Sequence, residues 1–125
     1  RVYCLDGDGA ELMHMGSLAF IAKQNPTNLI HICLNNEAHE SVGGMPTGCA
    51  GLSYARVAEA VGYKAVYCID TMDELKQILH DIKTKKALTF MEVRVSMKSR
   101  ADLGRPKETA AENKENFMKY HGVKE

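Results

Sequence analysis

The chain has 125 residues, 45% of them hydrophobic, and its 16 basic residues balance 16 acidic ones. A chain of this length can bury a core, while zero net charge provides no overall field that would attract nucleic acid or an anionic membrane. No apolar run is long enough to span a bilayer and no signal peptide is apparent. We therefore expect one cytoplasmic domain over residues 1–125, with no nucleic-acid or membrane partner.

The first half of the chain predicts two strands joined by a helix. Residues 2–5 and 29–34 are short apolar runs, which are typical of buried strands. Between them, residues 13–23 have helical spacing, and Asn25 followed by Pro26 should end that helix. One face of this helix is expected to carry Met13, Leu18, Ile21 and Ala22.

The middle of the chain begins with a glycine-rich stretch over residues 36–51, predicted as a long loop. A helix over residues 54–61 should follow, closed by Gly62. Residues 65–69 are predicted as the third strand.

Two capping boxes mark the remaining helices. Thr71 with Glu74 predicts a helix to about residue 83, and Thr109 with Glu112 predicts one to about residue 120. A fourth strand is expected over residues 87–95. This alternation predicts an α/β domain with a mostly parallel sheet and helices on both faces.

The cysteines give no metal or disulfide signature. They form no CxxC pair, and three of the four lie in apolar runs that predict strands. We therefore expect buried thiols rather than a zinc site or a disulfide framework. The four positions are Cys4, Cys33, Cys49 and Cys68.

The stretch Asp6-Gly7-Asp8-Gly9 follows the first predicted strand. An EF-hand loop starting at Asp6 fails at its fifth, sixth and twelfth positions, which are Ala10, Glu11 and Ser17. A Walker loop would need a Gly-Lys-Ser/Thr run, and a dinucleotide fingerprint would need glycine at Leu12. A plain strand-to-helix turn remains open.

Position suggests a more specific role, because ligands bind open α/β folds at the carboxyl edge of the sheet. Backbone N–H groups of Gly9 and Ala10 could face a phosphate there. Asp8 would repel that phosphate unless a divalent cation lay between them. Asn35 and Asn36 end the next predicted strand, so carboxylate, amide and carbonyl oxygens could meet as ligands of Mg²⁺.

Gly7, Asp8 and Gly9, one helical crossover and then Asn35 and Asn36 resemble the cofactor motif of thiamine-diphosphate enzymes. The segments GDGAELMHMGSLAFIAKQNPTNLIHICLNN, NEAHESVGGMPTG and SRADLGRPKETAAENKENFM resemble the phosphonopyruvate decarboxylases, with the sulfopyruvate decarboxylases as the nearest related group. The resemblance covers essentially the whole chain. It departs at Asn35, Glu37 and Met45, where the family pattern leads us to expect Asp, Gly and Gln.

This resemblance implies a thiamine-diphosphate-binding fold that holds thiamine diphosphate and Mg²⁺. By the family pattern, the ligands of Mg²⁺ are the side chains of Asp8 and Asn36 and the backbone carbonyl of Ala38. The cofactor's diphosphate is expected against Gly7, Gly9 and Ala10. The implied reaction is decarboxylation of phosphonopyruvate to phosphonoacetaldehyde and carbon dioxide, in phosphonate biosynthesis.

In this family a glutamate of a separate pyrimidine-binding domain activates the cofactor, and no residue of this chain fits that role. We therefore expect that the chain is most of a diphosphate-binding domain, lacking its N-terminal part, and inactive alone. The resemblance also implies a pyrimidine-binding domain, in the same or another chain, as partner, and a homo-oligomer.

Three histidines and two arginines lie outside this ligand set. His39 follows the metal motif, and its ordinary pKa of about 6.5 suits proton transfer in catalysis, although a loop histidine can also simply pack. His14 is expected to be structural, and His31 to be a hydrogen-bonded core residue. Arg100 and Arg105 could bind the substrate phosphonate or pair with carboxylates on the surface.

Other functions also remain open. A sulfopyruvate decarboxylase, or another 2-oxo acid decarboxylase or carboligase, would use the same cofactor motif. A non-catalytic Mg²⁺-binding receiver-like module would need an aspartate cluster, which Asp6, Asp8 and Asp70 loosely imitate. The pair Asn35 and Asn36 argues against that module.

Overall fold

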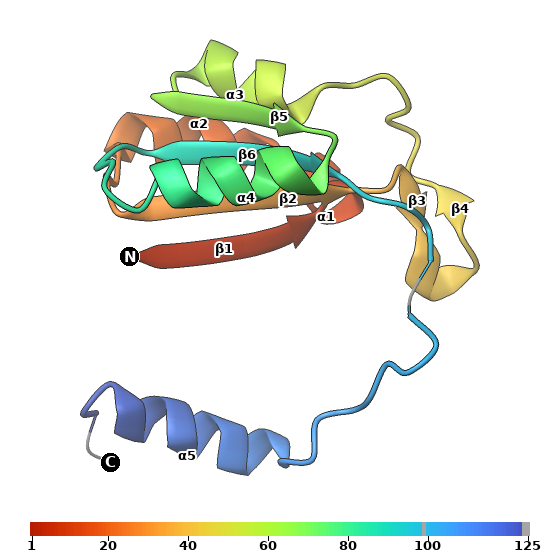
Figure 1. Cartoon of the computed structure of the whole chain (residues 1–125), viewed down its shortest axis with the longest axis vertical. Coiled ribbons are helices and arrows are strands. Elements are labelled where there is room, and N and C mark those ends of the chain that lie inside the picture. Colours follow the sequence, from red (N-terminus) through yellow and green to blue (C-terminus); the bar gives the residue numbers. More distant parts are fainter. Residues whose placement is uncertain (99, 124–125) are drawn as a thin grey trace.

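The computed structural model describes residues 1–98 and 100–123. Four strands form a parallel sheet, and a small hairpin and five α-helices surround or extend it (Figure 1). The elements in chain order are β1 (Val2–Gly7), α1 (Asp8–Met13), α2 (Gly16–Gln24), β2 (Leu29–Asn35), β3 (Ala38–His39), β4 (Met45–Pro46), α3 (Tyr54–Val61), β5 (Ala65–Ile69), α4 (Met72–Asp81), β6 (Thr89–Arg94) and α5 (Ala110–Tyr120).

The sheet has the order β1-β2-β6-β5, with every pair parallel. Strand β2 lies between β1 and β6, so the carboxyl ends of β1 and β2 meet at one edge. The register pairs Cys4 with His31 and Asp6 with Cys33. These findings confirm the α/β class and the parallel sheet.

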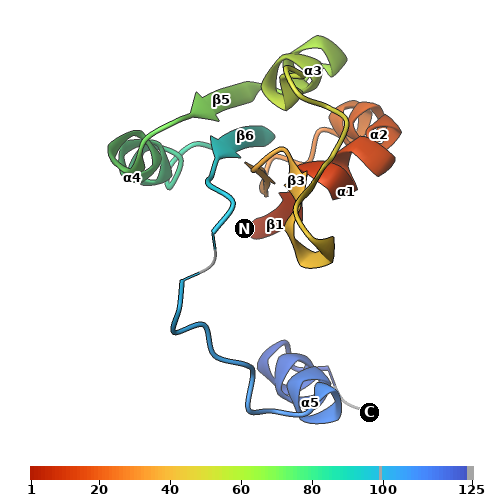
Figure 2. The same ribbon diagram turned by 90° about the vertical axis from the view of Figure 1, so that its right-hand side faces the viewer.

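Helices cover both faces of the sheet, as Figure 2 shows for α2 and α3 on one side and α4 on the other. One core cluster, which includes Leu18, Tyr54 and Phe90, lies under α2 and α3. A second cluster, which includes Ile30, Ile69 and Met91, lies under the apolar side of α4. A sheet covered on both faces explains why the central strands are apolar almost throughout.

The first crossover is two helices rather than one helix over residues 13–23. Helix α1 covers Asp8–Met13, and α2 begins at Gly16, a residue of low helix propensity. The break turns Met13 outward, where it is 76% exposed, so placing it on the buried face was wrong. Asn25 ends α2 in the left-handed conformation, as the sequence suggested.

The glycine-rich stretch is partly ordered into regular structure. Strands β3 and β4 pair antiparallel, with a short 3₁₀ helix at Glu40–Val42 between them. Gly43 and Gly44 have φ values of +94° and +74°, which only glycine adopts at little cost. This hairpin folds residues 38–46 over the carboxyl edge of the sheet (Figure 1).

The C-terminal arm, residues 100–123, extends away from the sheet and ends in α5 (Figures 1 and 2). Both capping boxes have formed, with Thr71 and Glu74 at α4 and Thr109 and Glu112 at α5. None of the helices in residues 1–98 and 100–123 is long and apolar enough to cross a membrane.

The four cysteines are free thiols, but not all are buried. Cys33 and Cys49 are buried as expected, whereas Cys4 is half-buried and Cys68 is exposed. Both exceptions lie in the edge strands β1 and β5, where one side of a residue lacks a neighbouring strand.

Candidate functional site

Asp8 is the centre of the candidate site, at the point where β1 ends and α1 begins. Its side chain is only 2% exposed. Thr47 Oγ1 donates to Asp8 Oδ2 at 2.8 Å, and the Cys49 thiol lies 3.8 Å from the same oxygen. These partners are neutral, so the described residues supply Asp8 with hydrogen bonds but with no positive side chain in an ion pair.

Tyr54 fixes the backbone at the same point, because its hydroxyl donates to the Asp8 carbonyl oxygen at 2.8 Å. The hydroxyl also lies 2.9 Å from Cys49 Sγ. Burial, together with the hydrogen bond to Cys49, raises the pKa of Tyr54, so the phenol keeps its proton and acts as a donor.

Gly9 allows the hairpin to approach the first turn of α1. A Cβ added to Gly9 would lie 2.6 Å from Cε1 of the half-buried His39 ring and 3.4 Å from Thr47 Cγ2. Only a residue without a side chain therefore fits here. The sequence placed Gly9 and His39 in one site, and the structure brings them into contact.

The chain turns sharply after β2, and two asparagine side chains hold the turn. Asn35 Oδ1 accepts from the Glu37 N–H at 3.1 Å, and Asn36 Oδ1 accepts from the Ala38 N–H at 3.0 Å. Between them, Glu37 has a φ of +57°, a conformation that favours glycine. Glycine is the residue that the family pattern leads us to expect there, so this departure keeps the backbone geometry at a cost in strain.

Glu92 supports this turn from within the sheet, and sequence reasoning missed it. The side chain is fully buried in β6. It accepts from Asn35 Nδ2 at 2.9 Å, from the Ala55 N–H at 2.9 Å and from Ser53 Oγ at 3.2 Å. The available signal was a carboxylate in the middle of the apolar run of residues 87–95.

Together, Asp8, Gly9 and the segment Asn36 to His39 form one cluster at the carboxyl edge. The Thr47 N–H donates to the Glu37 carbonyl at 3.1 Å while its hydroxyl binds Asp8, so Thr47 joins the two parts. The possible metal ligands in this cluster are the carboxylate of Asp8, the amide oxygen of Asn36 and the backbone carbonyl of Ala38. These are hard oxygen ligands of the kind that Mg²⁺ takes. A nearly buried carboxylate with neutral partners therefore fits a cation-dependent anion site.

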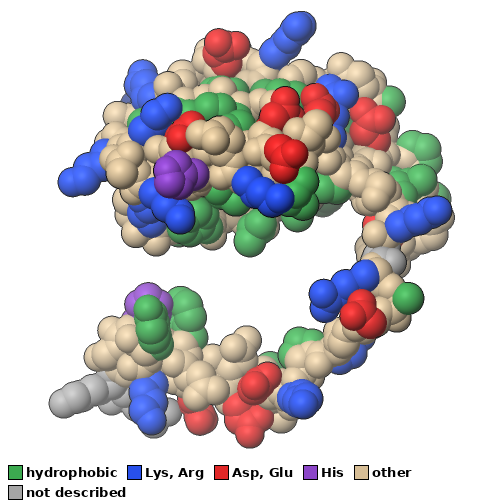
Figure 3. Space-filling view, in the orientation of Figure 1, with side chains coloured by type: hydrophobic (Ala, Val, Ile, Leu, Met, Phe, Trp, Pro, Cys, Tyr) green, Lys and Arg blue, Asp and Glu red, His purple; other side chains and the backbone are tan. Residues whose placement is uncertain are grey.

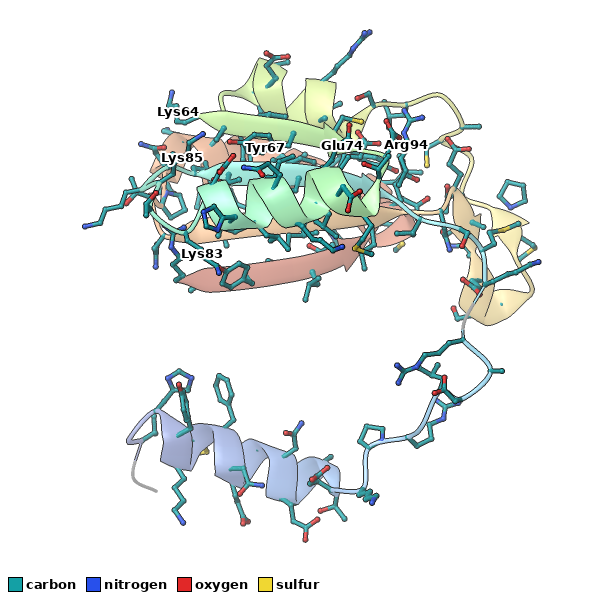
Figure 4. All side chains as sticks on the ribbon, in the orientation of Figure 1. Lys64, Tyr67, Glu74, Lys83, Lys85 and Arg94 are labelled. Carbon is teal, nitrogen blue, oxygen red and sulfur yellow. The ribbon has the colours of Figure 1, made fainter. Side chains whose placement is uncertain are left out.

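The two arginines proposed for substrate lie in the arm, apart from this cluster. Arg100 Nε pairs with Asp102 Oδ1 at 3.3 Å, and both side chains are exposed. Arg105 is also exposed. Arg94, in contrast, ends β6 beside the site and pairs with Asp70 at 3.4 Å (Figure 4). A hollow of about 180 Å³ is lined by Asn35, Asn36, Glu37, Arg94 and Val95.

The other histidines are placed differently. His14 ends α1 and is exposed. His31 is buried, with Nε2 2.8 Å from Asp6 Oδ2 and Nδ1 3.3 Å from the Tyr63 hydroxyl, which confirms the prediction of a hydrogen-bonded core histidine. Burial alone would lower the pKa of His31, but Glu11 and Asp6 outweigh it and raise that pKa.

The receiver-like alternative fails on topology. Asp6 and Asp8 belong to β1 and the start of α1, whereas Asp70 follows β5. Strands β1 and β5 are the two opposite edges of the sheet. The three aspartates therefore form no cluster.

Comparison with known proteins identifies the family of the fold. Residues 1–93 match the family described as "Thiamine pyrophosphate enzyme, C-terminal TPP binding domain". The chain is 36% identical over 119 residues to phosphonopyruvate decarboxylase of Streptomyces viridochromogenes, covering 95% of this chain and 30% of that protein. It therefore spans about a third of the length of this relative.

Two further relatives belong to related enzymes. Sulfopyruvate decarboxylase subunit beta of Methanothermobacter thermautotrophicus is 36% identical over 73 residues, covering 58% of this chain and 40% of that subunit. The 3D-(3,5/4)-trihydroxycyclohexane-1,2-dione hydrolase of Clostridium perfringens is 27% identical over 123 residues, covering 82% of this chain and 19% of that protein. This chain therefore belongs to the family of C-terminal thiamine-pyrophosphate-binding domains of thiamine pyrophosphate enzymes.

Proposed function

We propose that this chain is the thiamine-diphosphate- and Mg²⁺-binding domain of a decarboxylase that converts phosphonopyruvate to phosphonoacetaldehyde and carbon dioxide. The substrate is proposed from the 36% identity to a phosphonopyruvate decarboxylase over 119 residues. The observation that carries the cofactor part is the nearly buried Asp8 carboxylate, which faces neutral donors beside Gly9 and the turn after β2.

In this proposal the side chains of Asp8 and Asn36 and the carbonyl of Ala38 hold Mg²⁺. Gly7, Gly9 and Ala10 face the diphosphate, and the N–H groups of Gly9 and Ala10 belong to the first turn of α1, where no intrahelical acceptor is available. Thr47 and Glu92 keep the ligands in place, because one holds Asp8 and the other holds Asn35 next to Asn36.

When bound, thiamine diphosphate supplies the electron sink that accepts the electrons released as carbon dioxide leaves a 2-oxo acid. The chain's own residues bind the cofactor, orient it and exclude water around the buried Asp8. His39 is half-buried against Gly9, and its imidazole is proposed as the proton-transferring group of the site. Arg100 and Arg105 are proposed to bind the substrate phosphonate in the assembled enzyme.

The activating glutamate is proposed to come from a pyrimidine-binding domain of the same or another chain, in a homo-oligomer. We therefore expect no turnover of phosphonopyruvate by residues 1–125 alone, even with Mg²⁺ and thiamine diphosphate. Measured turnover by these residues alone would show that the activating group lies within them.

Calorimetry of thiamine diphosphate binding, with and without Mg²⁺, tests the cofactor part on the protein that includes the pyrimidine-binding domain. We expect binding that requires Mg²⁺ and is lost in Asp8→Asn. The matched control is Asp70→Asn, which removes an exposed carboxylate at the other edge of the sheet. Binding that is unaffected by Mg²⁺ and by Asp8→Asn would refute the site.

Turnover of phosphonopyruvate and of sulfopyruvate then tests the substrate. The second substrate is the specific alternative, because a sulfopyruvate decarboxylase subunit shares 36% identity over 73 residues. We expect the larger kcat/KM for phosphonopyruvate. A larger kcat/KM for sulfopyruvate would show that the enzyme is a sulfopyruvate decarboxylase. It would not affect the proposed cofactor site.

A further inference from the structure

A second polar cluster lies on the helix-covered face of β1 and β2 and takes no part in the proposed cofactor site. Cys4 and Asp6 are two residues apart on β1, so their side chains point to the same face. His31 is paired with Cys4 across the strands, and Glu11 reaches the same point from α1. Three elements of the fold therefore converge here.

The potential ligand atoms are close together. His31 Nε2 lies 2.8 Å from Asp6 Oδ2 and 3.1 Å from Glu11 Oε2. Cys4 Sγ lies 3.4 Å from Asp6 Oδ2. The ligand atoms of Cys4, Asp6 and His31 all lie within 4.8 Å of one another. Three ligands of a tetrahedral ion with bonds of about 2.0–2.3 Å are spaced by distances of this order, and Glu11, whose Oε2 lies 3.1 Å from His31 Nε2, is the nearest candidate for the fourth ligand.

Glu11 provides an independent sign that a ligand is missing. Its side chain is 2% exposed, and among the described residues its buried Oε1 atom has no hydrogen-bond partner. A buried carboxylate oxygen without a partner is unfavourable, because it has lost its hydrogen bonds to water and gained none in the protein. Its other oxygen, Oε2, lies 3.1 Å from His31 Nε2, so this buried carboxylate borders the cluster.

Charge balance points the same way. Two carboxylates around a single imidazole leave the cluster with net negative charge even when the ring carries a proton. A divalent cation on a neutral imidazole would cancel the charge of the two carboxylates, and the Cys4 thiolate as a fourth ligand would leave one net negative charge, with every anion bound directly to the cation. Buried charge is tolerated mainly when it is paired or binds a metal.

We propose that Cys4, Asp6, Glu11 and His31 form a binding site for a transition-metal ion of the Zn²⁺ class, separate from the Mg²⁺ site at Asp8. One nitrogen, one sulfur and two carboxylate oxygens are ligands that suit Zn²⁺, whereas Mg²⁺ takes oxygen alone. The hydroxyl of Tyr63, 3.3 Å from His31 Nδ1, orients the ring from behind.

The proposed ion would stabilise the position of the edge strand β1. Strand β1 pairs only with β2 among the described strands, and it leads directly into Asp8. A metal held by β1, β2 and α1 would tie these three elements together next to the cofactor site. Binding would release the proton of the Cys4 thiol, and any proton on His31 Nε2, to solvent.

The test uses the purified, reduced protein after removal of metal with a chelator, in excess Mg²⁺ and without thiamine diphosphate. We expect one equivalent of Zn²⁺ to bind by calorimetry, and one equivalent of Co²⁺ to give tetrahedral visible bands with a thiolate charge-transfer band. Cys4→Ser should abolish that band and lower the affinity by about tenfold or more, since even outer-shell changes cost about 10–100-fold. Cys68→Ser, which changes an exposed cysteine of the opposite edge strand, should change neither.

A second variant, Glu11→Gln, keeps the shape of the side chain and should also weaken Zn²⁺ binding by about tenfold. Circular dichroism of both variants confirms that they fold. Absence of saturable binding, an equal loss in Cys68→Ser, or a loss in Asn36→Ala with retention in Cys4→Ser would overturn the proposal. Since thiamine diphosphate is absent throughout, failure here leaves the proposed cofactor function untouched.

Discussion

The sheet body, residues 1–98, and the C-terminal arm, residues 100–123, use the same local signal in two different settings. Helices α4 and α5 both begin at a threonine–glutamate capping box. Leu75, Ile78 and Leu79 of α4 pack on the core, whereas Phe117 and Tyr120 of α5 are 66% and 85% exposed. The arm and its hydrophobic side chains lie apart from the body in Figure 3. A cap therefore locates a helix, and tertiary packing supplies most of its stability.

Removing a buried carboxylate of the body should have the largest effect on stability. Glu92→Ala leaves the donors of Asn35, Ala55 and Ser53 without their acceptor in a dry interior, so we expect a loss of roughly 3–5 kcal/mol in the free energy of unfolding. Glu115→Ala, the same change on the exposed arm, should stay within about 0.5 kcal/mol. Urea denaturation measures both, and equal effects would contradict the contrast.

Truncation of a core side chain should cause the next largest loss in the free energy of unfolding. Leu18 is a fully buried residue of α2, so Leu18→Ala should cost about 2–5 kcal/mol from lost burial and the cavity left behind. Phe117→Ala removes a larger side chain from the arm but should change the unfolding midpoint of the body little. A comparable loss from Phe117→Ala would mean that α5 packs against the body in solution.

The two caps allow a matched comparison. Thr71→Ala should cost the body about 1 kcal/mol, because Thr71 Oγ1 accepts from the Glu74 N–H at the start of α4. Thr109→Ala should reduce amide protection locally in α5 without shifting the global transition. Hydrogen exchange followed by NMR separates these outcomes, and a global shift from Thr109→Ala would oppose this account.

The smallest expected effect is the contribution of Glu74 to the pH dependence of stability. Backbone hydrogen bonds from Asp70 and Thr71, with the Thr71 hydroxyl, lower the pKa of Glu74 below its ordinary value of about 4.5. A lowered folded-state pKa adds stability that is present above about pH 4.5 and is lost as the pH falls through the folded value. The stability difference between the parent and Glu74→Gln should therefore shrink on acidification. A difference that grew instead would exclude the cap as its source.

The sequence contained enough to predict the parts of this molecule that depend on local pattern. Both capping boxes, the four strands of a parallel sheet, the end of α2 at Asn25 and the core position of His31 were predicted and are confirmed. Spacing alone also suggested that Gly9 and the residues after β2 meet, because parallel strands end at one edge.

The parts that sequence reasoning missed depend on contacts between distant residues. The acceptor role of Glu92 joins β6, the turn after β2 and α3, and no local pattern reports such a network. Asp6 has no role in the family pattern, yet its Oδ2 lies 2.8 Å from His31 Nε2 across the strands. The split between α1 and α2 and the β3–β4 hairpin arise from packing of short segments at the carboxyl edge, which helical or strand periodicity cannot reveal.

The central claim is that the body alone carries the cofactor's metal site, with Asp8 as its charged ligand. Calorimetry of thiamine diphosphate with the protein that includes the pyrimidine-binding domain tests it most directly, comparing the parent, Asp8→Asn and the arm variant Arg105→Ala. We expect Mg²⁺-dependent binding in the parent and in Arg105→Ala, and none in Asp8→Asn. Retained Mg²⁺-dependent binding in Asp8→Asn would contradict it.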